Sequence, residues 1–199
     1  MPKAMILRLA AIAVAAFATA VAAVALWFTP ERPKTEIVGE ALVGGPFALT
    51  DAEGRRRTDA EFRGKHMLVF FGFTHCPDFC PTALHTISQA LEKLGAKADK
   101  LAPIFITVDP ERDTPAQLGN YAQNFDKRIV MLTGTAEEIA AAARAYRVYY
   151  AKRPLERAGD YTMDHSVYIY LMGPDGKFIT HFRHAVSPAD LAEALRKRL

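Results

Sequence analysis

The chain has 199 residues, half of them hydrophobic, which is enough for one well-packed domain with appendages but short for two domains of ordinary size. Its net charge of +3 comes from scattered basic residues, without the aromatic-interleaved basic face of a nucleic-acid-binding protein, so we expect no nucleic-acid partner. Two cysteines are too few for a disulfide-stapled scaffold, and the pair is therefore expected to have a local chemical role.

The N-terminal 28 residues contain a long apolar segment. Residues 9–28 carry no charge and match the ~20 residues that a helix needs to cross a bilayer. A cleaved signal peptide is the alternative, because Ala-Val-Ala at 20–22 resembles a cleavage site. The apolar run exceeds the ~7–15 residues of a signal core and ends on Trp27 and Phe28, which favours a retained membrane anchor. Both interpretations place the rest of the chain in an extracytoplasmic compartment.

A short polar stretch separates this segment from the rest of the chain. Residues 29–40 contain two prolines and alternating charges, as is typical of a linker. We therefore divide the chain into an anchor at 1–28, a linker at 29–40 and one folded domain at 41–199.

The domain is predicted to begin with a hairpin and to have a second hairpin just before its last helix, with buried strands between the two hairpins. An Asp-x-x-Gly turn within 47–58 predicts the first hairpin, and Gly-Pro-Asp-Gly joins the two strands of the last one. Continuous apolar runs predict strands buried on both faces. The runs lie at 66–73, 103–109 and 129–132, and the strands of the last hairpin at 166–172 and 177–182.

Predicted helices alternate with these strands. The first follows the cysteines, has apolar residues at spacings of three and four from Leu84 to Leu94, and is expected to end at Gly95. The later three begin after hydroxyl residues that suit the N-terminal cap, namely Thr114, Thr135 and Ser187. This order predicts an α/β fold with a thioredoxin-like mixed sheet flanked by helices, in addition to the N-terminal transmembrane helix.

Cys76 and Cys80 lie where a buried strand gives way to a helix, the place where open α/β sheets put their chemistry. Because Pro81 suits the first helical position, we expect Cys80 to cap the helix and both cysteines, each followed by proline, to be extended. A thiol near a helix N-terminus ionises readily. The spacing leaves open a disulfide, an inert buried pair and a soft-metal site for Cu(I) or zinc.

A histidine could complete such a metal site. His165 precedes a strand that, in a thioredoxin-like sheet, runs beside the cysteine-bearing strand, at the point where thioredoxins place a proline. It is either a ligand or a satisfied core histidine. His75 adjoins Cys76, but neighbours in an extended chain point in opposite directions, so we do not expect it to be a ligand. The remaining histidines are expected to be structural or solvated: His66, His85, His181 and His184.

Four motifs together resemble the Sco/SenC family of copper-handling, thioredoxin-like proteins: FGFTHCPDFCPTAL, ITVDPERDTP, LTGT and YTMDHSVYIYLM, in this order across roughly residues 47–199. The resemblance implies that Cys76, Cys80 and His165 bind one copper ion. It also implies a role in assembling the binuclear copper centre of cytochrome c oxidase. Asp109 and Asp113 lie within a family motif and suit a turn and a helix start as well as they suit a functional role.

From the resemblance we expect a metallochaperone without a catalytic residue, holding Cu(I) through two thiolates and a neutral imidazole. Cu(II) is a second candidate, because imidazole suits both oxidation states. The expected partners are cytochrome c oxidase subunit II or another copper acceptor, a periplasmic copper donor and a thiol reductant. The alternative is an enzyme, a dedicated thiol–disulfide oxidoreductase that reduces the cysteines of the acceptor.

The expected location is a bacterial inner membrane, with a single-pass anchor and the domain in the periplasm. The anchor begins almost at the start of the chain, without the Arg- and Ser-rich composition of a transit peptide, which favours this membrane over a mitochondrial one.

Overall fold

The computed structural model describes residues 43–157 and 159–199. The expected anchor at 1–28 and linker at 29–40 lie outside the described residues. Within the described ranges, no helix is both long enough and apolar enough to span a membrane.

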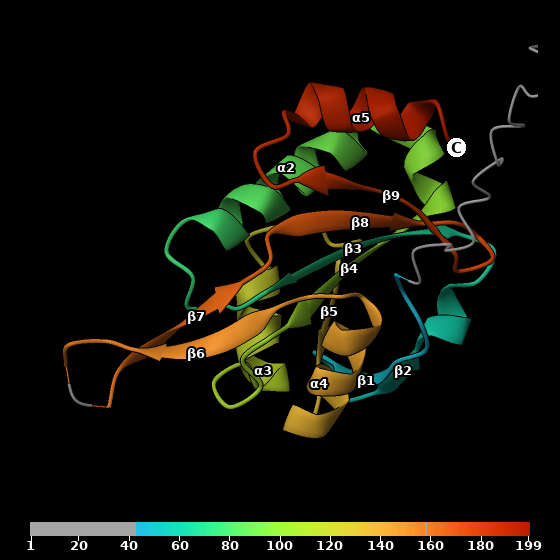
Figure 1. Ribbon diagram of the computed structural model, residues 1–199. Coiled ribbons are helices and arrows are strands. Elements are labelled where there is room, and N and C mark those ends of the chain that lie inside the picture. Colours follow the sequence, from blue (N-terminus) through green and yellow to red (C-terminus); the bar gives the residue numbers. More distant parts are fainter. Residues whose placement is uncertain (1–42, 158) are drawn as a thin grey trace, which may run out of the picture. The chain divides into compact units, whose positions relative to one another are not determined.

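A mixed sheet of seven strands forms the centre of the described domain (Figure 1). The strand order is β2-β1-β5-β4-β3-β8-β9, in which β3, β4 and β5 are parallel and the other pairings are antiparallel. This arrangement confirms the predicted mixed sheet and both predicted hairpins. The strands are β1 (Ala48–Asp51), β2 (Arg56–Thr58), β3 (His66–Gly72), β4 (Leu101–Thr107), β5 (Val130–Thr133), β8 (Tyr168–Met172) and β9 (Phe178–Arg183).

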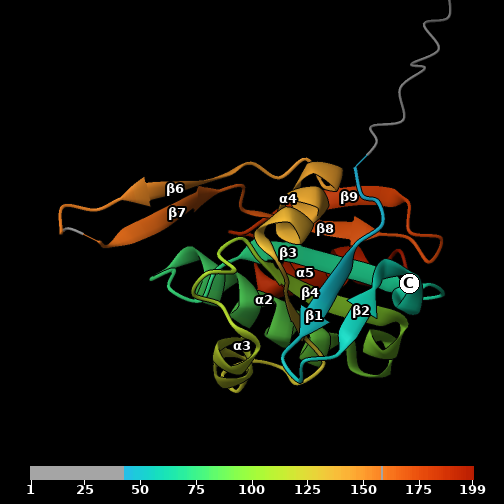
Figure 2. The same ribbon diagram turned by 90° about the horizontal axis from the view of Figure 1, so that it is seen from below.

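Helices cover both faces of this sheet (Figure 2). On one face, α2 and α5 lie together, and α4 lies on the other. The core alternates accordingly: Phe71 of β3 packs against Tyr146 at the end of α4, with ring centroids 5.4 Å apart, whereas its neighbour Phe70 faces Phe105 of β4 at 6.3 Å. The helices are α2 (Phe79–Leu94), α3 (Pro115–Ala122), α4 (Ala136–Ala145) and α5 (Pro188–Arg196), with 3-10 turns η1 (Asp59–Phe62) and η2 (Gly95–Lys100).

The predicted helix ends are confirmed at four places. Thr114, Thr135 and Ser187 are the cap residues of α3, α4 and α5, and each side chain accepts a hydrogen bond from a backbone N–H three residues later. Such a cap is worth ~1 kcal/mol. Helix α2 ends at Leu94, and Gly95 follows with a positive φ of 57°, a conformation that glycine adopts without steric cost.

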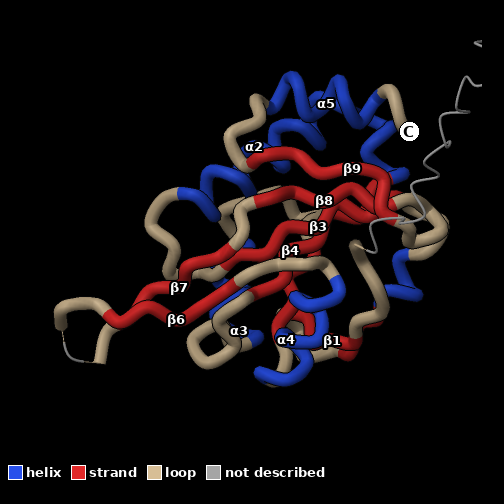
Figure 3. The backbone as a smooth tube through the Cα atoms, viewed as in Figure 1, coloured by secondary structure: helices blue, strands red, loops and turns tan. Residues whose placement is uncertain are grey.

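Two further strands form a ribbon outside the main sheet. β6 (Tyr150–Pro154) and β7 (Tyr161–His165) pair with each other in antiparallel register, and Figures 1 and 3 show the ribbon extending away from the seven-stranded sheet. Among the described strands, neither has any other partner. The ribbon was not predicted. β7 leads within three residues into β8, so His165 stands at the junction between the ribbon and the main sheet.

Candidate metal site

The loop between β3 and α2 carries both cysteines. α2 begins at Phe79 with Asp78 as its cap residue, so the prediction that Cys80 is an extended cap residue is wrong. Cys80 lies in the first helical turn and Cys76 in the loop before it. Pro81 occupies the third helical position, which it tolerates because backbone N–H groups of the first turn have no partner within the helix.

This arrangement directs the helix N-terminus at Cys76 instead of Cys80. The backbone N–H of Cys80 donates to the Cys76 sulfur over 3.4 Å. Neither cysteine is in a disulfide. Cys80 is fully buried, and Cys76 is 9% exposed. The two sulfurs therefore differ in access, with Cys76 the one that an outside molecule can reach.

Glycine at the end of β3 makes room for the deeper thiol. A Cβ atom built on Gly72 would lie 2.9 Å from the Cys80 sulfur and 2.8 Å from the Phe105 ring. Both distances are shorter than van der Waals contact allows, so a side chain here would displace Cys80 or the ring.

The His165 ring lies next to the buried Cys80 thiol. Its Nε2 lies 3.6 Å from the Cys80 sulfur. The predicted neighbourhood is confirmed, because β8 pairs antiparallel with β3. Its Nδ1 lies 2.9 Å from the carbonyl oxygen of Ser166, which can only accept a hydrogen bond. The proton therefore sits on Nδ1, and the lone pair of Nε2 is directed at the thiol.

The thiols share a proton unequally. A hydrogen bond from the Cys80 thiol lowers the pKa of Cys76 to about 4, against the effect of burial and with smaller contributions from the backbone of Cys80 and Asp78. The hydrogen bond to Cys76 and burial raise the pKa of Cys80. At neutral pH the pair is thus a thiolate on Cys76 beside a thiol on Cys80. Thiolates are the nucleophiles and the metal ligands among cysteines.

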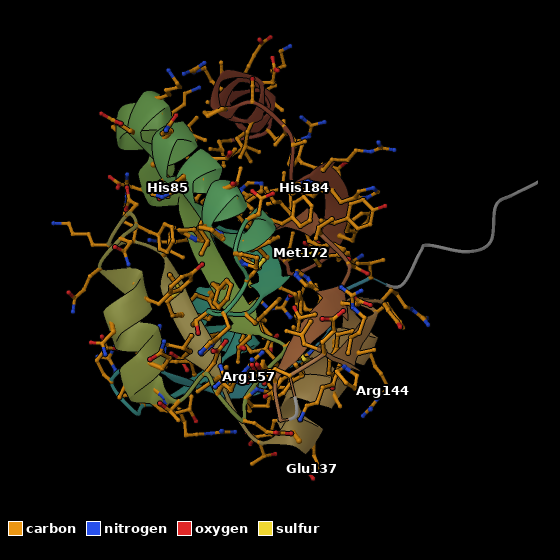
Figure 4. The ribbon with its side chains drawn as sticks, turned by 90° about the vertical axis from the view of Figure 1, so that its left-hand side faces the viewer. His85, Glu137, Arg144, Arg157, Met172 and His184 are labelled. Atoms are coloured by element: carbon orange, nitrogen blue, oxygen red, sulfur yellow. The ribbon has the colours of Figure 1, made fainter. Side chains whose placement is uncertain are left out.

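A cavity of about 380 Å³ opens beside Cys76, between the cysteine loop and the ribbon. Figure 4 views the molecule from this side, with Arg157 labelled in the loop of the ribbon. The lining is mostly apolar, and a partner molecule could approach Cys76 through it. Its lining includes Phe73, Cys76, Pro77, Phe79, Met163 and His165.

The donor atoms of the cluster suit a soft ion, since sulfur and imidazole nitrogen select Cu(I) or zinc. Within the part of the chain that the structure describes, no group of three or more Cys, His, Asp and Glu side chains is already arranged to hold a metal. The cluster is held instead by hydrogen bonds, at separations of 3.4 and 3.6 Å.

The His75 side chain contacts residues outside the cluster of Cys76, Cys80 and His165. Its Nδ1 lies 3.1 Å from the Thr74 hydroxyl and 3.9 Å from Asp113, and its side chain is half-exposed. The other four histidines pack against aromatic rings or, for His66, lie near Lys100. Figure 4 labels His85 on α2 and His184 after β9, and their ring partners are Phe125 and Phe79.

Sequence reasoning missed the role of the carboxylate that holds the cysteine loop. Asp113 is fully buried and accepts hydrogen bonds from the Thr74 backbone N–H (2.9 Å), the Thr74 hydroxyl (2.6 Å) and the Thr107 hydroxyl (2.6 Å). Thr74 stands two residues before Cys76, so Asp113 fixes the start of the loop. Its partner Thr74 is 39 residues away in the chain, and the family motif was the only sequence signal for it.

A mixed sheet flanked by helices, a Cys-x-x-x-Cys loop at the end of a central strand and a histidine facing the deeper thiol define a thioredoxin-like protein whose site combines two sulfurs with one imidazole. The chain belongs to the SCO1/SenC family, whose model matches residues 35–199. The resemblance seen in the motifs is thereby confirmed.

Relatives of known sequence include two mitochondrial proteins. The chain is 44% identical over 172 residues to the SCO2 homolog of Bos taurus, covering 85% of this chain and 65% of the relative. It is 41% identical over 167 residues to the SCO1 homolog of Homo sapiens, covering 83% of this chain and 56% of the relative. The match thus spans less than two thirds of each relative's length.

Solved structures show the same fold. Bradyrhizobium japonicum ScoI with copper bound is 50% identical, with a TM-score of 0.74 over 79% of this chain and 99% of that one. Yeast Sco1 with copper bound is 38% identical, with a TM-score of 0.72 over 78% and 87%. BsSco, described as having a disulfide switch and as a member of the Sco family of cytochrome c oxidase assembly proteins, is 25% identical, with a TM-score of 0.62 over 80% and 93%.

Proposed function

We propose that this protein is a copper chaperone of cytochrome c oxidase assembly that binds one copper ion through Cys76, Cys80 and His165. The observation that carries the proposal is the Nε2 lone pair of His165 directed at the Cys80 sulfur, 3.6 Å away. Copper bound to the related ScoI and yeast Sco1 supports the choice of metal.

Each of the three side chains brings a different property to the site. Cys76 supplies a thiolate at neutral pH and lies on the cavity wall, where an incoming ligand reaches it. Cys80 supplies a second sulfur once its proton leaves. The Ser166 carbonyl holds the His165 ring by its Nδ1–H, which keeps Nε2 aimed inward. Copper is the cargo of this site, as Cu(I) with Cu(II) as a second state, and it leaves by ligand exchange through the open side.

Dedicated reduction of the acceptor is the second candidate, because two cysteines that are not joined by a disulfide can also pass two electrons to the disulfide of an acceptor. The disulfide switch described for BsSco favours keeping this candidate. In that case the acceptor disulfide becomes two thiols while Cys76 and Cys80 become a disulfide.

One experiment separates delivery from reduction. The copper-loaded protein is mixed with a copper-free soluble domain of subunit II, and copper and free thiols are counted on both proteins after separation. We expect copper to move to the acceptor while Cys76 and Cys80 stay reduced. Oxidation of these two cysteines in step with reduction of an acceptor disulfide, without copper transfer, would support the oxidoreductase instead.

We further propose that residues 1–28 anchor the protein in a bacterial inner membrane, with the domain in the periplasm. The support is the uncharged run at 9–28. The full-length protein is expected to stay with membranes through an alkaline wash, and a chain starting at Thr29 to be soluble. A mature N-terminus near Ala23 would replace the anchor with a cleaved signal.

A further inference from the structure

The loop of residues 109–113, between β4 and α3, contacts both halves of the site. At one end of it, Asp113 holds Thr74 and with it the start of the cysteine loop. Two other residues of the loop, Asp109 and Arg112, bind Tyr161, the first residue of β7. Tyr161 stands four residues before His165 on the same strand. One short loop therefore connects the strand that carries the imidazole to the segment that carries the thiols.

Arg112 and Asp109 contact Tyr161 at its ring, its hydroxyl and its backbone. The Tyr161 hydroxyl donates to Asp109 Oδ1 over 2.9 Å, and Arg112 Nη1 donates to the Tyr161 carbonyl oxygen over 2.9 Å. The guanidinium carbon lies 3.8 Å from the centre of the Tyr161 ring. Arg112 Nε in turn donates to Asp109 Oδ2, so the two charged groups fix each other.

A second route leads from Arg112 to the imidazole. The guanidinium lies 5.9 Å from the centre of the Phe73 ring, and Phe73 meets the His165 ring edge-on at 5.8 Å between centroids. Phe73 is almost fully buried, so its ring cannot easily give way. Arg112 can therefore influence the position of His165 in two ways, through the backbone of β7 and through the Phe73 ring.

These contacts matter because side chains, and not strand pairing, hold the ribbon against the 109–113 loop, where Lys152 of β6 also pairs with Glu111. Among the described strands, β6 and β7 pair only with each other. We infer that Arg112, together with Asp109 and Tyr161, is a positioning group that sets the separation of His165 Nε2 from the two sulfurs. The inference rests on the proposed three-ligand copper site, to which it adds the residues that bring the third ligand into place.

The test compares Arg112→Gln with the unmutated full-length protein by competition against a Cu(I) chelator. We expect the Cu(I) affinity to fall ~10–100-fold, the usual effect of removing a group that orients a ligand. Arg112→Lys should lower the Cu(I) affinity nearly as much. Lysine keeps the positive charge but lacks the planar guanidinium that donates to both Tyr161 and Asp109. Arg128→Gln is the matched control, because Arg128 is also paired with a nearby aspartate, Asp126, but lies outside the site. The Cu(I) affinity of this variant should equal that of the unmutated protein.

A readout without copper tests the geometry directly. In the reduced, metal-free protein, NMR cross-peaks between the Phe73 and His165 rings should be strong in the unmutated chain and weak in Arg112→Gln, while the Cys76–Cys80 midpoint potential stays the same. If Arg112→Gln fails to fold, Tyr161→Phe removes only the hydroxyl and should lower the affinity ~5-fold, as expected for one hydrogen bond.

The outcomes distinguish this inference from the proposed function. Unchanged Cu(I) affinity in Arg112→Gln, alongside a large loss in His165→Ala, overturns the positioning role and leaves the three-ligand site standing. Unchanged affinity in His165→Ala overturns the three-ligand site and the positioning inference with it.

Discussion

His165→Ala is expected to weaken Cu(I) binding by well over 100-fold while leaving the fold and the Cys76–Cys80 thiols intact. Loss of a ligand should exceed the ~10–100-fold effect of losing a group that only orients one. The imidazole is partly exposed, so its removal takes little from the core. Competition against a Cu(I) chelator measures the change, and the melting temperature checks the fold.

His75→Ala is the matched control for this variant. His75 adjoins Cys76 in the chain, yet its ring faces Thr74 and Asp113. Its removal should change the affinity little. If His165→Ala and the unmutated protein bind Cu(I) equally well, the site has no third ligand there, and the thiols are left to redox work.

Alkylation of Cys76 in the reduced, metal-free protein is expected to proceed at a nearly constant rate between about pH 5 and pH 8. Its pKa is lowered to about 4, so the reactive thiolate already predominates at the lower limit, and the rate should fall only as the pH drops through about 4. The thiolate fraction of an ordinary cysteine, with a pKa of ~8.5, rises several-hundred-fold over the same interval. Cys80, buried and with a raised pKa, should react far more slowly.

Mass spectrometry identifies the alkylated cysteine and gives the rate at each pH. Cys80→Ala is the informative control, because it removes the hydrogen bond that lowers the Cys76 pKa most. The flat region should then begin at a higher pH. A rate for the unmutated protein that climbs tenfold per pH unit up to pH 8 would contradict the thiolate.

The predicted elements that the structure confirms are those whose local sequence determines their environment. The run His66–Gly72 is buried along almost its whole length, and a short apolar run rich in β-branched and aromatic residues indicates a strand buried on both faces. The cap residues Thr114, Thr135 and Ser187 satisfy backbone groups within three residues, so their signal is local as well.

The ribbon gave no such signal. Its strands Tyr150–Pro154 and Tyr161–His165 are largely exposed or half-buried, and strands without a buried face show no hydrophobic alternation. The start of α2 was misplaced for a different reason. Proline is compatible with several positions of a first turn, so Pro81 could not by itself determine which residue caps the helix.

The site could be predicted only in part for the same physical reason. The two cysteines are neighbours, and their position after a buried strand was evident from their surroundings. His165 was singled out because a thioredoxin-like sheet would place it beside that strand, and its identity as a ligand came from the family resemblance. The bonds of Asp113 to Thr74 and of Asp109 to Tyr161 join segments 39 and 52 residues apart, and no local pattern announces them.

The 85 residues that separate Cys80 from His165 also order the events of folding. The cysteine pair can form with its own loop and helix, whereas the imidazole arrives only when β8 pairs with β3, a contact that requires closure of a long loop. Until then the two cysteine sulfurs are in place without the His165 nitrogen. Capture of a metal by all three groups is therefore confined to molecules that have completed their sheet.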